Sequence, residues 1–218
     1  MNKIIPSLAT LVLLTSLSTP SIAAVESQKD IMEAAASACE DMVEAVATGG
    51  MPAAQPKIND LKAALKKAHG FLKADVAKQL ETDADEITKL AAGSSTTELS
   101  LKAVEAFKDI VNASDWKRSA APKDISMLDY SGYKLGILAS TANTDWAAAA
   151  KTADEAHAAW QTLLPKFKSQ NLKELAQAID AGALDAVKRK DAAGLQFASK
   201  LQLVSIDIIE GSFAKPKL

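Results

Sequence analysis

Apolar residues recur at alternating steps of three and four along most of the chain, which is the spacing of one face of an α-helix. The clearest run holds this spacing from Trp146 through Trp160 to Phe167. No stretch shows the sustained alternation of β-branched residues that is typical of strands. Helix-breaking residues lie mostly between the apolar runs, at Gly49 and Gly50, Pro52 and Pro56, Gly93, and Pro122. The pattern predicts an all-α protein of about eight helices, arranged as one or two up-and-down bundles.

Each predicted helix carries one apolar stripe that we expect to face the core. The second helix should begin near Pro56, because proline suits a first helical turn. The sixth should bend or end at Pro165, which lies inside its apolar run. The eighth follows Asp191, a natural N-cap. Its core-facing stripe is predicted to consist of Phe197, Leu201, Val204 and Ile208.

The breaks divide the chain into two halves of similar length. We expect a signal peptide at residues 1–23, a first four-helix half at 24–113, a connector at 114–122 and a second four-helix half at 123–218. An equal helix count and length in both halves is what a duplication would produce. Apolar spacing fixes which face of a helix is buried and not which helix covers it, so two bundles and one shared core both stay open.

The first residues have the layout of a secretory signal peptide. Lys3 precedes an apolar run at residues 4–17, and Ser21 and Ala23 are suitable small residues for cleavage after Ala23. The apolar run is shorter than the roughly 20 residues that a membrane-spanning helix needs. No cysteine follows the cleavage region directly, which argues against a lipid anchor. We therefore expect export to the periplasm of a Gram-negative bacterium, with no membrane span in the mature form.

Charge and cysteine content narrow the function further. The chain has 25 basic and 27 acidic residues and no concentrated basic stretch, so we expect no binding to nucleic acid. Cys39 is the single cysteine and cannot form a disulfide within the chain. It is therefore buried in the core, bound to a metal or available to link a homodimer.

The most specific pattern for a metal site lies in the first helix. Met32, Cys39 and Met42 share one face of that helix, and their soft sulfur atoms suit Cu(I). The same three positions belong to the apolar stripe, where methionine and free cysteine are ordinary core residues. We favour the core interpretation and keep copper handling as an alternative.

Other cofactor and catalytic motifs are missing from the sequence. His157 lies three residues after Asp154, close enough to share a metal, but the repeated Glu-x-x-His pairs of di-iron bundles do not occur. A local ion pair at His69 or His157 is the simpler interpretation. The haem motif C-x-x-C-H, the nucleophile motif G-x-S-x-G and the zinc motif H-E-x-x-H are absent as well. We predict no cofactor and no enzymatic activity.

Aromatic residues are scarce and gather in the second half. Tyr130, Tyr133 and Trp146 could form a wall of a small-ligand pocket, although bulky rings can also fill space between alanines. Trp160 continues an unbroken apolar stripe and should be core. Trp116 differs, because it lies in the connector beside two basic residues and would mark a docking surface if exposed.

These observations favour a non-enzymatic periplasmic binding protein built as a helical bundle. Its ligand is a partner protein or a small molecule, and the second half is expected to make the contact. One alternative is a metal-handling protein that binds Cu(I) through the sulfur residues of the first helix. Another is a structural or chaperone-like helical protein. The oligomeric state, including a homodimer, stays open.

We predict that the protein isolated from the periplasm begins at Ala24 or Val25, because small residues precede both positions. Intact-mass spectrometry and N-terminal sequencing would identify that end. Ala23→Arg places a bulky charge at the cleavage position and should leave the longer form, whereas Lys29→Arg should be processed normally. A chain that keeps Met1 in the wild type would contradict the predicted compartment.

Overall fold

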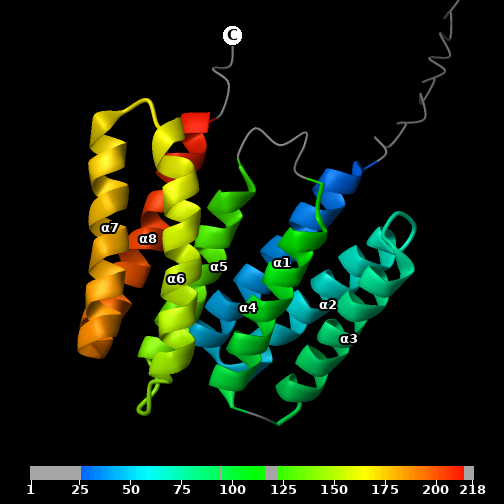
Figure 1. Cartoon of the computed structure of the whole chain (residues 1–218). Helices are drawn as coiled ribbons and strands as arrows, with labels where there is room; N and C mark the ends of the chain where they lie inside the picture. Colours follow the sequence, from blue (N-terminus) through cyan, green and yellow to red (C-terminus); the bar gives the residue numbers. More distant parts are fainter. Residues whose placement is uncertain (1–25, 94, 116–121, 214–218) are drawn as a thin grey trace, which may run out of the picture.

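The computed structural model describes residues 26–93, 95–115 and 122–213, except for the side chain of residue 207. These residues form α-helices and one short 3-10 helix and contain no strand (Figure 1). The elements are α1 (Gln28–Gly49), α2 (Met51–Ala68), α3 (Ala74–Ala91), α4 (Thr96–Ala113), α5 (Lys123–Ala139), α6 (Trp146–Leu163), η2 (Leu164–Lys166), α7 (Gln170–Arg189) and α8 (Ala192–Phe213). The predicted all-α class with eight helices is confirmed. None of the described helices is both long and apolar enough to cross a bilayer.

Local chemistry accounts for the helix ends. The Ser27 hydroxyl accepts from the Asp30 N–H at 3.1 Å, and the Asp30 carboxylate accepts from the Ser27 N–H, so two backbone donors at the start of α1 are satisfied. As predicted, α6 ends just before Pro165, where the chain forms a 3-10 turn. The predicted start of α2 is wrong. The helix begins at Met51, with Pro52 in its first turn and Pro56 one turn further inside.

The helices form two groups of four. In the first group, α1 contacts α2, α2 contacts α3, α3 contacts α4, and α4 returns to α1. The second group repeats this order with α5, α6, α7 and α8. The two groups lie side by side and meet where α4 contacts α5 (Figure 1). We call this contact between α4 and α5 the joint.

Most predicted stripes face the core, and α6 does so along its length. Its alanines at positions 149, 153 and 156 are buried, together with Trp160 and Leu163. Trp160 has no exposed surface and lies in one cluster with Ile125, Leu128 and Ile179. Alanine at the other positions leaves space that this large ring fills.

The predicted orientation of α8 is wrong. Phe197 and Val204 are each 70% exposed and Ile208 is 57% exposed, and these are the exposed large apolar side chains that the described residues contain. We call this outward face, with half-buried Leu201, the α8 stripe. The opposite face of α8 is buried although it carries several polar residues: Leu195, Ala198, Ser199, Gln202, Ser205, Ile206 and Ile209.

Close packing between α5 and α8 explains this orientation. A Cβ atom at Gly132 would lie 2.8 Å from the Leu203 side chain, and one at Gly136 would lie 3.1 Å from the Ser199 hydroxyl. The two glycines therefore let α8 approach closely. At the same contact, the Gln202 amide donates to the Leu128 carbonyl at 2.6 Å and to the Ser131 hydroxyl at 2.8 Å. Their mutual hydrogen bonds allow these polar groups to be buried.

We predict that Trp160→Ala destabilises the protein by about 3–5 kcal/mol, because a fully buried large ring is removed from a packed cluster. Urea unfolding followed by circular dichroism would measure this cost. Gln161→Ala, at the next and exposed position of α6, should change the free energy of unfolding by less than about 0.5 kcal/mol. Equal effects of the two substitutions would contradict the packing described.

Candidate functional site

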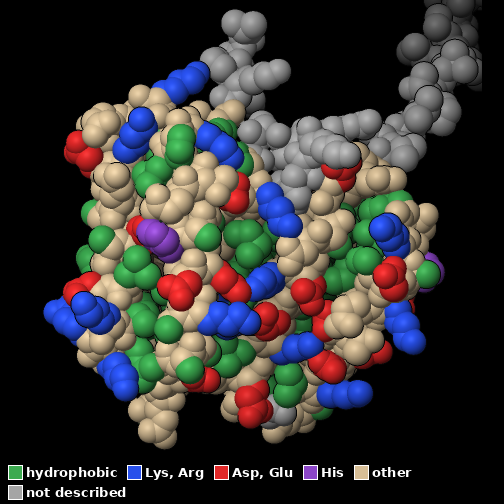
Figure 2. All heavy atoms as spheres, viewed as in Figure 1, with side chains coloured by type: hydrophobic (Ala, Val, Ile, Leu, Met, Phe, Trp, Pro, Cys, Tyr) green, Lys and Arg blue, Asp and Glu red, His purple; other side chains and the backbone are tan. Residues whose placement is uncertain are grey.

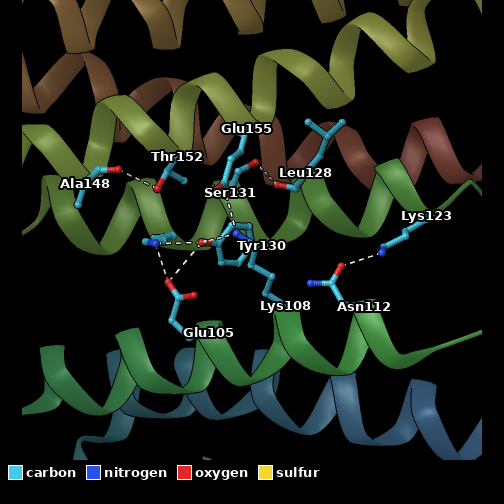
Figure 3. A network of polar contacts seen from close by, with 11 residues as sticks. Glu105, Lys108, Asn112, Lys123, Leu128, Tyr130, Ser131, Ala148, Thr152 and Glu155 are labelled. Atoms are coloured by element: carbon cyan, nitrogen blue, oxygen red, sulfur yellow. Dashed lines mark hydrogen bonds and ion pairs between the residues drawn. The ribbon is translucent and has the colours of Figure 1, made fainter. Parts of the chain in front are cut away.

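The joint has two unlike sides, and on one of them a polar network surrounds Tyr130. This residue of α5 is 1% exposed. Its hydroxyl donates to Glu105 of α4 at 3.3 Å and accepts from Lys134 at 2.9 Å (Figure 3). Lys134 also pairs with Glu105 at 2.5 Å. The phenol therefore lies between a carboxylate and an ammonium group contributed by the two groups of helices.

A second lysine extends the network to α6. Lys108 of α4 pairs with Glu155 of α6 at 2.8 Å, and its ammonium nitrogen lies 4.5 Å from the centre of the Tyr130 ring. That distance is within the range of a cation–π contact. Acidic and basic side chains are interspersed over this face, including its middle, where the two groups meet (Figure 2). This side of the joint is thus filled by paired charges.

The environment of Tyr130 disfavours its ionised form. Burial raises the pKa of the Tyr130 hydroxyl far above its usual range, and the nearby Glu105 carboxylate adds to the shift. Tyr130 is thus a neutral structural residue, and it does not line the groove described next.

The other side of the joint holds a groove of about 740 Å³. One wall is the face of α1 from Gln28 to Glu44, a length of about 24 Å along the helix. The opposite wall comes from α5 and α8, and the ends of α4 and of the α2–α3 turn complete it. The groove exists because α1 and α8 lie on the same side of the joint without closing against each other.

Apolar and polar side chains contribute about equally to the surface of the groove. The charged residues that the structure describes in its lining are Lys29 and six acidic residues: Glu33, Glu40, Glu44, Asp115, Asp129 and Glu210. The apolar side chains come from α1, the α2–α3 turn, α4 and α8: Met32, Ala36, Phe71, Leu72, Phe107, Val111, Ala113, Leu203, Val204 and Ile206. Tyr133 adds a polar group, since its hydroxyl donates to the Glu44 carboxylate at 2.8 Å across the groove. Burial and this carboxylate raise the pKa of Tyr133 well above its usual range. The groove thus combines apolar surface, an acidic polar surface and one oriented hydrogen-bonding pair.

The four aromatic candidates from the sequence have different surroundings. Tyr133 lines the groove. Tyr130 belongs to the network at the joint, and Trp146 is half-buried against the cluster that contains Leu135. Trp116 lies outside the described residues, so its proposed docking role stays a prediction. The structure thus brings only Tyr133 of the three described aromatics to a cavity surface.

The three sulfur residues lie together in the core of the first group. Cys39 and Met42 are buried, and Met32 is buried with an edge at the groove. Burial raises the pKa of the Cys39 thiol well above its usual range, which opposes formation of the thiolate that metals bind. In the described part of the chain, no group of three or more His, Cys, Asp or Glu side chains could hold a metal. Copper binding that uses methionines as well stays a prediction.

Each histidine lies beside a carboxylate. His157 lies 2.7 Å from Asp180 of α7 through its Nδ1 atom, and His69 lies 3.9 Å from Glu81. The partner of His157 in space is therefore Asp180 and not the sequence neighbour Asp154. Sequence spacing could not reveal this pair, because it joins two helices.

Comparisons with known proteins add no relative: the chain matches no family model, no curated protein and no solved structure. The groove residues on α1 and α8 were not anticipated from the sequence. A signal for them exists only in α8, where apolar residues cover more of the surface than one buried face requires.

We predict that Tyr130→Phe lowers the free energy of unfolding by about 1–3 kcal/mol at neutral pH, because Lys134 and Glu105 lose a buried hydrogen-bonding partner. Urea titration would measure the loss. Tyr133→Phe removes one hydroxyl at a half-buried position and should cost less, about 0.5–1.5 kcal/mol.

The difference in stability between the wild type and the Tyr130→Phe variant should become smaller in alkaline solution. Above about pH 10 the unfolded chain ionises at Tyr130, while the folded chain keeps the proton because its pKa is raised. Wild-type stability therefore falls with rising pH by a contribution that Tyr130→Phe lacks, and the advantage of the wild type should shrink. A constant difference from pH 8 to pH 11 would contradict the burial of the phenol.

Proposed function

We propose that the protein is a non-enzymatic binding protein that holds a small amphipathic molecule without negative charge in the groove beside the joint. The observation that carries the proposal is the groove itself, with a volume of about 740 Å³ and apolar residues from several helices. Small-molecule sites commonly have volumes of about 300–1,000 Å³, apolar walls and a few placed polar groups. The groove has such a volume and offers apolar surface from several helices, and the charged residues of its lining are mostly acidic.

The contacts available in the groove define the ligand chemistry. Phe107 and Val111 of α4 and Leu203 of α8 supply apolar surface on both sides of the joint. Tyr133 and Glu44 supply one polar position, where a ligand hydroxyl or amide can hydrogen-bond. A negatively charged ligand group would be repelled by the Glu44 carboxylate at that position. Together with the other acidic residues of the lining, these features support an amphipathic ligand that is neutral or positively charged.

The expected compartment agrees with this proposal. The signal-like residues before Ala24 support export, and a periplasmic protein meets apolar small molecules that diffuse between two membranes. The proposal assigns no catalytic step, since the polar pair of Tyr133 and Glu44 is hydrogen-bonded to itself and the sequence lacks a nucleophile motif.

We predict that the mature protein binds the neutral dye N-phenyl-1-naphthylamine with a fluorescence increase and that Ala36→Trp weakens this binding at least tenfold. Ala36 lies on the groove wall of α1, so an indole ring there occupies the ligand volume. Ala34→Trp is the matched control, because Ala34 is exposed on the same helix and does not line the groove. Circular dichroism would establish that both variants keep their helix content.

Two further results separate the groove from other apolar surfaces. Phe197→Ser removes an exposed apolar side chain outside the groove and should leave dye binding unchanged. Native mass spectrometry of wild-type protein from its own periplasm should show a bound small molecule that Ala36→Trp lacks. Equal dye binding by the Ala36 and Ala34 variants would overturn the proposed function.

A further inference from the structure

We propose that the groove selects a positively charged ligand, an organic ammonium group with an apolar body, whose charged end lies where α1 and α5 face each other. The inference rests on the proposed function, because it assigns the charge of the ligand in the same groove. Three observations carry it: the carboxylates around Tyr133, the distant position of the lysine in the lining, and the apolar surface one helical turn away.

Three carboxylates surround the Tyr133 hydroxyl from two walls of the groove. Glu40 and Glu44 lie one turn apart on α1, and Asp129 lies one turn before Tyr133 on α5. The Glu44 carboxylate accepts from the Tyr133 hydroxyl at 2.8 Å, and all three carboxylates help to raise the pKa of Tyr133. Glu40 and Asp129 are half-buried, so water and salt screen their charges less than at an open surface. The result is a concentrated negative potential inside a recess.

The basic residue that the structure describes in the lining lies far from this position. Lys29 pairs with Glu33 at 2.9 Å, one turn along the same helix. It precedes Glu44 by 15 positions, which corresponds to about 22 Å along α1. The Debye length at physiological ionic strength is about 8 Å, so Lys29 contributes little to the potential at Glu44. The described lining therefore favours a ligand cation beside Tyr133.

The acidic residues also conflict with the rules for a stable helix surface. Glu40 and Glu44 carry like charges one turn apart, a spacing that weakens a helix. Asp129 faces the same recess from α5 and adds repulsion between the walls. A bound ammonium group would relieve this repulsion, because its N–H groups donate charge-assisted hydrogen bonds to carboxylates. The Tyr133 ring in the same recess offers a cation–π contact as well.

Apolar surface begins one helical turn from these carboxylates. Ala36 precedes Glu40 by about 6 Å along α1, and Met32 lies one further turn away. Phe107 of α4 and Leu203 of α8 contribute apolar surface from the other walls. A ligand whose charged end lies at the carboxylates can therefore place its apolar body along α1. This arrangement fits an amphipathic molecule with one cationic end.

Displacement of N-phenyl-1-naphthylamine by ligands with apolar chains of matched length tests the charge preference. Decylammonium should displace the dye at about one tenth or less of the concentration that neutral 1-decanol requires, and decanoate should be weaker than either. Raising NaCl from about 20 mM to about 500 mM should reduce the difference between decylammonium and decanol, because salt screens the attraction. All ligands are used below the concentration at which dye fluorescence changes without protein. This series needs only the wild type.

A pair of double variants tests the position of the charged end. Glu40→Gln with Glu44→Gln keeps the side-chain size and should reduce the preference for decylammonium over decanol by about fivefold or more. Glu81→Gln with Glu174→Gln is the matched control, because it removes two exposed negative charges outside the groove. The control should keep the wild-type preference. Circular dichroism would establish that both double variants keep their helix content.

The possible results separate this inference from the proposed function. Absence of dye binding by the wild type would overturn both. Dye binding with equal displacement by decylammonium and decanol would overturn only the charge of the ligand. A preference for decylammonium that survives Glu40→Gln with Glu44→Gln would overturn the position of the charged end.

Discussion

The close contact between α5 and α8 determines the features that distinguish this protein from a simple pair of bundles. Gly132 and Gly136 leave room for α8 to approach, and Gln202 finds hydrogen-bonding partners on α5 at that short distance. Rotating α8 to bury Phe197 would place a large ring against the glycines and leave the amide without those partners. The contact therefore fixes α8 in one orientation, with its apolar stripe outward and Leu203 and Ile206 at the groove.

The joint between α4 and α5 holds the two groups together in an asymmetric way. On one side, Tyr130 and its charged neighbours fill the space between helices. Because ion pairs lose hydration when they are buried, a network of this kind contributes less to stability than its short distances suggest. We interpret it as a determinant of how the groups are placed. On the other side, apolar surface faces an open groove, which is the place where a ligand can gain from burial.

The sequence predicted the helices well because a helix with a single buried face has apolar residues at regular intervals. In α6 this periodicity is unbroken, and the helix ends just before Pro165 as predicted. The sequence of α8 contains two stripes that could face the core. The periodicity predicts burial of the more apolar stripe, whereas the structure buries the one that contains Gln202. Hydrogen bonds to α5 decide this competition, and they depend on a contact across about 70 positions of the chain. The groove could not be predicted from the sequence for the same reason, since its walls come from helices at opposite ends of the chain.

The order of helix contacts has a consequence for how the chain folds. Within each group, every main contact joins helices that follow one another, except for the one that returns from the fourth helix to the first. Each ring of helices therefore closes over about 90 residues, and no strong pairing requires the two ends of the chain to meet. Such a low contact order favours rapid collapse of each group by itself. We therefore expect the joint and its buried phenol to form after the helices within each group have packed.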